Sequence, residues 1–233
     1  MSFKVFNIYG ERCSGTNFIC KSIIDNFNIY PIDIYHSRHK HFFGHDDDNA
    51  LIKKSTDVIF ICIVRNPIDY LMSFFKCLYF QPTSRSVDFL TFISSEFYSV
   101  NVAGEMMCDR NFKNGYKRYR DIFEMRSVKN KFLFSEIPVL TTNYYFMKYE
   151  NLKSNPGKIL IDIKNKFGLA QIDSDFLIES RRILPGLLVD NTPIRENYTV
   201  DDSDCKEIIK SRLDFETEAL IGYDKDSIMS RLV

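Results

Sequence analysis

The chain has 233 residues, and its 31 lysines and arginines are balanced by 31 aspartates and glutamates. This balance leaves no net field that would favour nucleic acid or an anionic membrane, so any specificity for an anion must be local. Hydrophobic residues make up 45% of the chain, including 21 Phe and 13 Tyr, which excludes a disordered protein. The length predicts a single domain over residues 1–233.

The cysteines and the apolar runs indicate the compartment. None of the six cysteines forms a CxxC pair, and several lie inside apolar runs, where a thiol is typically a small buried hydrophobe. No apolar run approaches the length of about 18 residues that a membrane span needs, and the N-terminus lacks a signal-peptide pattern. We therefore expect a reduced, cytoplasmic protein without a transmembrane segment.

The first predicted elements are a strand and a helix joined by a short loop. An apolar run from Phe3 ends at Gly10, and apolar residues return at helical spacing at Ile19, Ile23 and Phe27. A strand, a tight loop and a helix present backbone N–H groups and the positive end of the helix dipole to an anion. We predict that this loop binds a phosphate-like group.

The next part of the chain contains a second strand end with helix-starting residues. Residues 30–36 form a weak predicted strand, followed by a histidine-rich segment over 36–45 and an acidic turn at 46–48. The continuous apolar run 57–64 is typical of a strand buried on both faces of a parallel sheet. Arg65-Asn66-Pro67 ends it, with Asn as the helix cap and Pro at the first helical position.

The remaining patterns complete an α/β arrangement. A strand is predicted over Val139–Tyr149, and helices are predicted at 87–98, over most of the basic run 110–131, at 156–167, near 203–213 and at 215–221. Strands that alternate with helices predict a three-layer α/β fold with a mostly parallel central sheet flanked by helices. Ligands of such sheets bind beyond the carboxyl ends of the strands, so residues 10–17 and 65–67 should face one site.

The spacing of the loop glycines resembles a nucleotide-binding P-loop only in part. Gly10 and Gly15 have the required spacing, but the next residues are Thr16-Asn17, where a Walker loop needs Lys and Ser/Thr. Phosphoryl transfer from magnesium ATP is therefore disfavoured. A thiolate phosphatase built on Cys13 is also disfavoured, because it needs an Arg where Ile19 stands.

What the loop does contain is one strong cation and two hydroxyl groups. Arg12, Ser14 and Thr16 stand in it, next to a predicted helix N-terminus. This set suits a phosphate or sulfate ester that is bound without a metal.

Two motifs give a specific resemblance. Glu11–Asn17, with the sequence ERCSGTN, resembles the 5′-phosphosulfate loop of sulfotransferases that use 3′-phosphoadenosine-5′-phosphosulfate (PAPS). Arg65–Ser73, with the sequence RNPIDYLMS, resembles the motif with which that family holds the 3′-phosphate. A third, weaker match is Lys148–Leu152 with Pro156. The resemblance implies a P-loop NTPase-like sulfotransferase architecture.

The resemblance also implies a reaction and a set of site residues. The reaction would transfer a sulfuryl group from PAPS to a hydroxyl or amine of an unidentified acceptor, a glycan or a small molecule, with adenosine 3′,5′-bisphosphate as product and no metal. Arg12 would be the catalytic cation. The residues implied to bind PAPS are Arg12, Cys13, Ser14, Gly15, Thr16, Asn17, Arg65 and Ser73. Asn17 departs from the commoner Thr of the family.

A base must remove the proton of the acceptor, and histidine is the usual side chain for this near neutral pH. All four histidines lie within 36–45, and Lys40-His41 resembles the segment that carries the base in the family. We predict His41 as the base, with His39, His45 and Glu11 as reserves. A solvated turn and a metal site remain alternatives for this segment.

Two other functions remain open: a divergent P-loop small-molecule kinase, and a non-catalytic nucleotide- or anion-binding domain of the same fold. Arg65 could also have a purely structural role in which it pairs with Asp69. The basic run 110–131 is more typical of a solvated helix face than of a binding patch. Arg181 and Arg182 are further candidates for the 3′-phosphate, with a surface role as the alternative.

Overall fold

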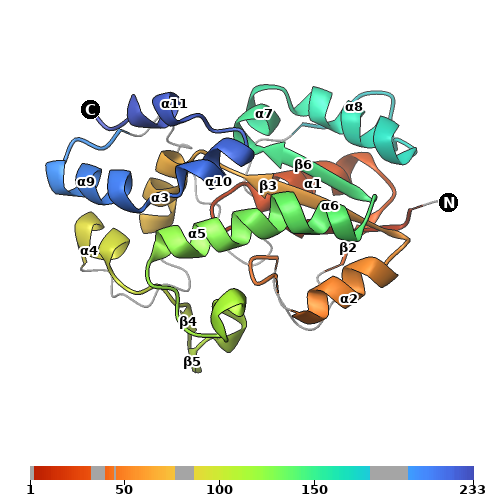
Figure 1. Cartoon of the computed structure of the whole chain (residues 1–233). Helices are drawn as coiled ribbons and strands as arrows, with labels where there is room; N and C mark the ends of the chain where they lie inside the picture. Colours follow the sequence, from red (N-terminus) through yellow and green to blue (C-terminus); the bar gives the residue numbers. More distant parts are fainter. Residues whose placement is uncertain (1–2, 33–39, 45, 77–86, 179–198) are drawn as a thin grey trace.

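A computed structural model describes residues 3–32, 40–44, 46–76, 87–178 and 199–233 of the chain. Its centre is a parallel sheet of four strands in the order β2-β1-β3-β6 (Figure 1). The strands are β1 (Val5–Tyr9), β2 (Tyr30–Pro31), β3 (Val58–Val64) and β6 (Tyr144–Lys148). The predicted α/β class with a parallel central sheet is confirmed.

Helices surround the sheet, and most of them begin with an Asn or Asp cap. They are α1 (Thr16–Asn26), α2 (Asp46–Lys54), α3 (Pro67–Phe75), α4 (Phe89–Ser94), α5 (Ile122–Lys131), α6 (Ile137–Leu140), α7 (Tyr149–Ser154), α8 (Pro156–Phe167), α9 (Ser203–Arg212), α10 (Phe215–Leu220) and α11 (Lys225–Met229). A small antiparallel hairpin, β4 (Val100–Asn101) and β5 (Gly104–Glu105), lies between α4 and α5. None of the described helices is long and apolar enough to cross a membrane.

Strand β3 divides the interior into two hydrophobic cores. All of its residues are buried, and they alternate between the two cores, as side chains on a strand must. Ile59, Ile61 and Ile63 pack with residues of α1, α7 and α8, whereas Phe60 and Cys62 pack with residues of α3, α5 and α9. The fold therefore has three layers, and the prediction of a strand buried on both faces is confirmed.

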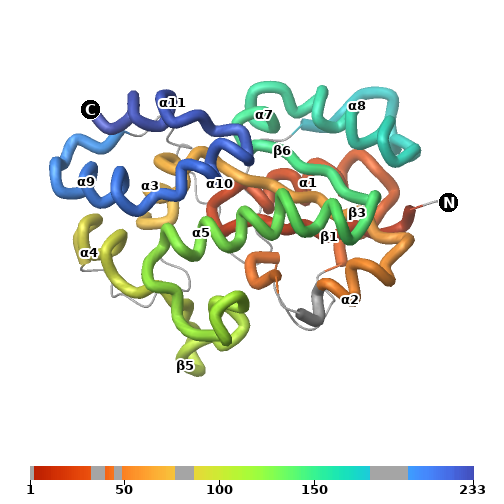
Figure 2. Tube along the Cα trace, in the orientation of Figure 1, coloured from red at the N-terminus to blue at the C-terminus, as the bar shows by residue number. Residues whose placement is uncertain are grey.

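The C-terminal helices lie on the same side of the sheet as α5. Figure 2 shows α5 crossing in front of the sheet, with α9, α10 and α11 around its N-terminal half. Helix α10 contacts α5, and α9 contacts α4. This arrangement brings residues from the end of the chain against the carboxyl ends of the central strands.

Several predicted boundaries need correction. The strand predicted over Val139–Tyr149 begins only at Tyr144, because Ile137–Leu140 forms the short helix α6, with Pro138 in its first turn, where a missing N–H is tolerated. The acidic turn predicted at 46–48 is instead the first turn of α2. The helix predicted over 87–98 is shorter, since Asp88 caps it and the backbone of Ser95 is extended.

Candidate anion-binding site

The carboxyl ends of β1 and β3 lie side by side, so the segments that follow them meet. Val5–Tyr9 pairs in parallel with Val58–Cys62 along its whole length. Beyond the strands, Nη1 of Arg65 donates a hydrogen bond of 2.9 Å to the carbonyl oxygen of Cys13. The two segments are therefore in contact, and that they face one ligand site stays a prediction.

The glycines of the loop permit close packing that a side chain would prevent. A Cβ atom at Gly10 would lie 2.7 Å from the carbonyl oxygen of Ile63. Gly15 has a φ of +92°, and a Cβ atom there would lie 2.3 Å from Cδ2 of Tyr149. Cys13 also has a positive φ, of 64°, which is unusual for a residue with a side chain. The loop is therefore a tight turn held between β3 and Tyr149.

Helix α1 begins directly after this turn and lacks a side-chain cap. Gly15 is its N-cap and makes no capping hydrogen bond, since glycine has no side chain to accept one from the N–H groups of the first turn. Among the described residues, no side chain caps the N–H groups of this first turn, and the positive end of the helix dipole lies at the loop. Such a terminus suits phosphate or sulfate oxygens.

Buried donors near the loop lack partners within the described part of the chain. They are Oγ of Ser14, Nε of Arg65, and Nε and Nη1 of Arg12. A buried polar group without a hydrogen bond costs about 1–3 kcal/mol, and more when it is charged. The edge of the sheet thus concentrates donors that an anion could satisfy.

Arg65 is fixed in place from two sides. Its guanidinium group lies 4.7 Å from the ring centre of Tyr149, and its carbonyl oxygen accepts a hydrogen bond of 2.8 Å from Arg126. A purely structural role for Arg65 would pair it with Asp69, but Asp69 forms an ion pair of 2.7 Å with Arg231. Arg65 therefore directs its Nη1 donor to the loop.

The residues next to Arg65 are supported by the C-terminal part of the chain. Glu150 accepts hydrogen bonds from the backbone N–H of Asn66, at 2.8 Å, and from the hydroxyl of Tyr223, at 2.7 Å. Behind them, the buried Arg126 pairs with Glu218 at 2.6 Å. Glu150 thus joins the start of α3 to the C-terminal part of the chain.

Ser73 lies on α3 and is half-buried. Its carbonyl oxygen accepts a contact of 3.6 Å from Sγ of Cys13, so this part of α3 lies against the loop. Thr16 is buried at the start of α1, and Oδ1 of Asn17 accepts a hydrogen bond from Nζ of Lys40. The structure therefore brings the predicted PAPS-binding residues together.

Arg12 belongs to a group that we call the buried charge cluster, which consists of Glu11, Arg12, Asp109 and Lys129. Nη2 of Arg12 lies 2.8 Å from Asp109, and Nζ of Lys129 lies 2.5 Å from Asp109 and 3.4 Å from Glu11. Ser99 also donates to Asp109, at 2.5 Å. The guanidinium group of Arg12 lies among the aromatic rings of Phe42, Phe74 and Phe97.

The surroundings shift the pKa values of the two carboxyl groups of this cluster in opposite directions. Burial raises the pKa of Glu11 above its ordinary value, against the attraction of Lys129 and Arg12. Burial alone would also raise the pKa of Asp109, but Lys129 and Arg12 outweigh it and hold that pKa well below its usual range. Asp109 is therefore the permanent anion of the cluster.

His41 lies against the loop. Its Nδ1 is 2.6 Å from the carbonyl oxygen of Gly10, and its own carbonyl oxygen accepts a hydrogen bond of 2.8 Å from Lys129. The backbone N–H of Gly10 donates to the carbonyl oxygen of Lys40, at 3.3 Å. The segment with the predicted base is thus attached to both the loop and the buried charge cluster.

The remaining candidates, His39, His45, Arg181 and Arg182, lie outside the described residues. Within the described ranges, no group of three or more His, Cys, Asp or Glu side chains could hold a metal ion.

Asp109 and Lys129 had not been singled out from the sequence. Asp109 is 97 residues from Arg12 and lies in a segment without clear periodicity. Lys129 and Arg126 belong to the basic run that was interpreted as a solvated helix face, but both side chains are buried. A lysine on the same face of a helix as buried apolar residues, such as Ile122 and Met125, was the available signal.

Fold and loops together define an α/β protein with a strand–loop–helix segment that is a candidate site for an anion. The crystal structure of mouse sulfotransferase SULT7A1 complexed with PAP is similar to this chain, with 15% sequence identity and a TM-score of 0.41. The similarity covers 97% of this chain and 74% of that chain. The neighbour is a sulfotransferase, but at this identity and TM-score the likeness carries no argument about the ligand of this chain. No protein-family model and no curated protein sequence matches the chain.

Proposed function

We propose that the chain is a sulfotransferase that uses PAPS as its donor and sulfates a hydroxyl or amine of an acceptor. The observation that carries the proposal is the meeting of two anion-binding segments at one sheet edge, through the hydrogen bond of Arg65 to Cys13. A ligand with phosphate groups at both ends of an adenosine needs two such segments side by side.

The residues at this edge fit the donor. The 5′ end would lie at the uncapped start of α1, with the backbone N–H groups of residues 13–17 and the hydroxyl of Ser14. The 3′-phosphate would be held by Arg65, whose Nε lacks a protein partner within the described ranges, and by Ser73. PAPS would supply the sulfuryl group.

Arg12 would stabilise negative charge on the transferring group. Two of its guanidinium nitrogens, Nε and Nη1, have no partner among the described residues. The ion pair with Asp109 fixes the third nitrogen, Nη2, so the cation is held in one orientation before any ligand binds.

His41 is proposed to accept the proton of the acceptor. The carbonyl oxygen of Gly10 can only accept, so Nδ1 of His41 carries the hydrogen of this contact. In the neutral ring, Nε2 then has the lone pair. Nε2 is therefore the atom that would take the proton.

Calorimetry with adenosine 3′,5′-bisphosphate tests the binding half of the proposal. Arg65→Ala should weaken binding about 10- to 100-fold, because it removes charge-assisted hydrogen bonds worth about 1.5–3 kcal/mol. Arg65→Lys keeps the charge but loses the paired N–H donors of the guanidinium group. Its affinity should therefore lie between that of Arg65→Ala and that of the native protein. Lys131→Ala, which removes an exposed charge on α5, is the control and should bind normally. Absence of binding by the native protein, or equal binding by Arg65→Ala, would end the proposal.

The catalytic half requires transfer of labelled sulfate from PAPS to a panel of sugars, phenols and amines. His41→Ala should bind the nucleotide and lose transfer, and full transfer by this variant would reassign the base. Magnesium-dependent binding of ATP in place of the bisphosphate would favour the kinase alternative.

One observation favours a second candidate, a non-catalytic anion-binding domain. Arg12, the proposed catalytic cation, is buried and paired with Asp109. Tight nucleotide binding without transfer to any acceptor of the panel, in the native protein, would support this candidate.

A further inference from the structure

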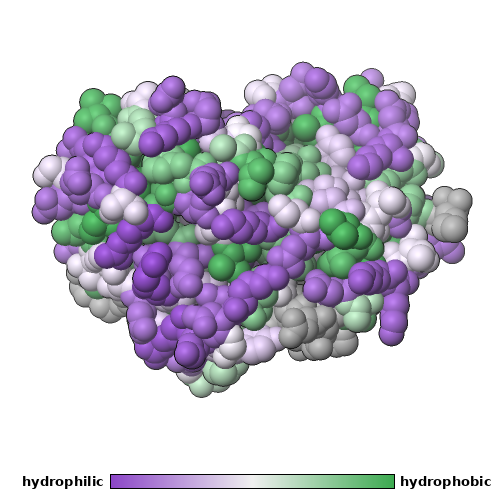
Figure 3. All heavy atoms as spheres, in the orientation of Figure 1, coloured by the Kyte–Doolittle hydropathy of each residue, from purple (hydrophilic) through white to green (hydrophobic). Residues whose placement is uncertain are grey.

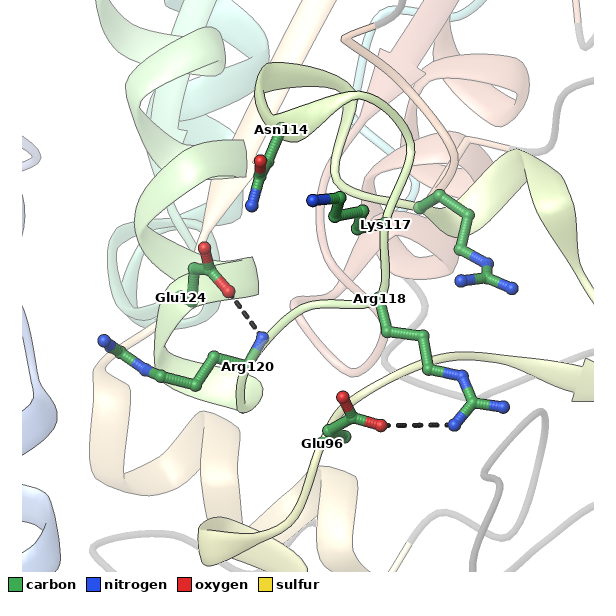
Figure 4. Close-up of a pocket in the computed structure, with 7 residues that line it drawn as sticks. Glu96, Asn114, Lys117, Arg118, Arg120 and Glu124 are labelled. Atoms are coloured by element: carbon green, nitrogen blue, oxygen red, sulfur yellow. Dashed lines mark hydrogen bonds and ion pairs between the residues drawn. The ribbon is translucent and has the colours of Figure 1, made fainter.

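A pocket lies apart from the loop, beside the N-terminal end of α5. Its volume is about 620 Å³, within the usual range for small-ligand sites. Every residue that lines it is polar or charged: Glu96, Arg110, Asn114, Lys117, Arg118, Arg120 and Glu124. Figure 4 shows these side chains coming from α5, from the segment before it and from the chain after α4.

The Glu124 carboxylate, which α5 contributes to this pocket, already accepts hydrogen bonds from other groups of the protein. Glu124 accepts a hydrogen bond of 3.0 Å from Nδ2 of Asn111 and one of 2.5 Å from the backbone N–H of Arg120. Both of its oxygens are therefore already engaged with donors. Its negative charge contributes less to repelling an anion than an unpaired carboxylate would.

Arg118 forms a fixed wall of the pocket. It donates to both oxygens of Glu105, at 2.9 and 3.1 Å, and to one oxygen of Glu96, at 3.1 Å. Its guanidinium group also stacks on Tyr98, 3.8 Å from the ring centre. The guanidinium group of Arg118 is therefore held in place by Glu105, Glu96 and Tyr98, and these two carboxylates offset its charge.

Other donors of the pocket are not used in this way. Lys117 is exposed and has no ion pair with any described residue, and Figure 4 shows its ammonium group pointing across the pocket toward Asn114. Arg110 pairs with Glu105 at 2.9 Å, but its Nε is buried without a hydrogen-bond partner in the described part of the chain. The pocket therefore offers the positive charge of Lys117, whereas the charge of Arg110 is partly neutralised by Glu105.

The backbone holds the walls in place. The backbone N–H of Asn111 donates to the carbonyl oxygen of Lys117, at 2.9 Å, and Phe97 and Tyr119 exchange two backbone hydrogen bonds. The hydroxyl of Tyr119 donates to the carbonyl oxygen of Arg110, at 3.0 Å. A site fixed in this way loses little entropy when a ligand binds.

From these observations we infer that the pocket is a binding site for an acidic saccharide. Lys117 and Arg110 match carboxylate or sulfate groups, and Asn114 and the second oxygen of Glu96 match sugar hydroxyls. Figure 3 shows hydrophilic side chains gathered on this face around β4 and β5, which suits a chain of sugars running out of the pocket. The inference does not rest on the proposed function, because none of these residues belongs to the loop site.

Calorimetry with a heparin-derived tetrasaccharide on the full chain tests the inference. Lys117→Glu should lower the affinity about tenfold, because it replaces an attraction by a repulsion of similar size. Lys113→Glu is the matched control: Lys113 is in the same segment and exposed but does not line the pocket, so its affinity should change less than about threefold. Raising the salt concentration should weaken binding by the native protein.

The inference would be overturned by equal affinity of Lys117→Glu and the native protein, by equal loss in both variants, or by binding of neutral chitotetraose as tight as that of the acidic probe. The affinity for adenosine 3′,5′-bisphosphate should be unchanged in Lys117→Glu, which keeps the two sites distinguishable. A parallel loss of nucleotide affinity would mean that the two sites are not independent, and would also contradict the inference.

Discussion

Replacement of Lys129 by Met should destabilise the protein strongly, because Lys129 is the buried cation that joins three segments. Its ammonium group lies 2.5 Å from Asp109 and 3.4 Å from Glu11, and it donates to the carbonyl oxygen of His41 at 2.8 Å. Methionine has a similar shape but leaves Glu11 without its nearest cation. Removing one partner from a buried ion pair costs about 3–5 kcal/mol. This is a large share of a total stability of about 5–15 kcal/mol.

Urea unfolding at neutral pH, followed by far-ultraviolet circular dichroism, measures this loss. The control is Lys131→Met, two positions along the same helix, where the lysine is 52% exposed and pairs with Asp214. An exposed pair contributes about 0–1 kcal/mol, so the control should change little. The double variant Lys129→Met with Glu11→Gln should recover part of the loss, because it no longer buries an unpaired carboxylate.

Two results would refute this reasoning about Lys129. One is a loss in Lys129→Met no larger than that in the Lys131→Met control. The other is a double variant that is no more stable than Lys129→Met alone, since the cost would then not come from the charge left on Glu11.

Two further predictions concern the loop and the pH dependence of stability. Gly15→Ala should destabilise the protein by more than about 1–2 kcal/mol and weaken nucleotide binding, because it combines a positive φ with a clash against Tyr149. The control is Gly168→Ala, where φ is +62° and the space around the residue is open. It should show only the smaller backbone effect in the same urea assay. Because the pKa of Asp109 is lowered in the folded state, its carboxylate stabilises the fold above about pH 4, and this stability is lost as the pH falls further. Asp109→Asn should therefore show a flatter fall in stability below about pH 4 than the native protein, and equal slopes would contradict the assignment.

Local patterns in the sequence were sufficient for the elements that position the site. The strand β3 follows from an unbroken apolar run, and the start of α3 follows from Asn66 and Pro67, whose cap geometry is observed as predicted. The loop between Gly10 and Gly15 follows from its glycines. These signals are local because a helix cap, a tight turn and an unbroken apolar run each depend on residues that are close together in the sequence.

Contacts between distant segments could not be read from the sequence. The pairing of Arg12 with Asp109 joins residues 97 positions apart, and no periodicity marks Asp109 as its partner. The strand predicted from Val139 failed for a different reason: apolar residues on both sides of Pro138 fit a short helix as well as a strand. Tertiary packing decides between helix and strand in such a segment, and the local sequence pattern contains no information about that packing.

The support of Arg65 from the end of the chain has a consequence for synthesis. The loop, β1 and β3 leave the ribosome early, but Arg126 is held by Glu218, and Asn66 accepts a hydrogen bond from Arg231, 165 residues later. A nascent chain that has completed its central sheet still lacks these contacts, and domains generally fold as whole units. The candidate anion-binding edge would therefore reach its observed arrangement only after the chain up to Arg231 has been translated.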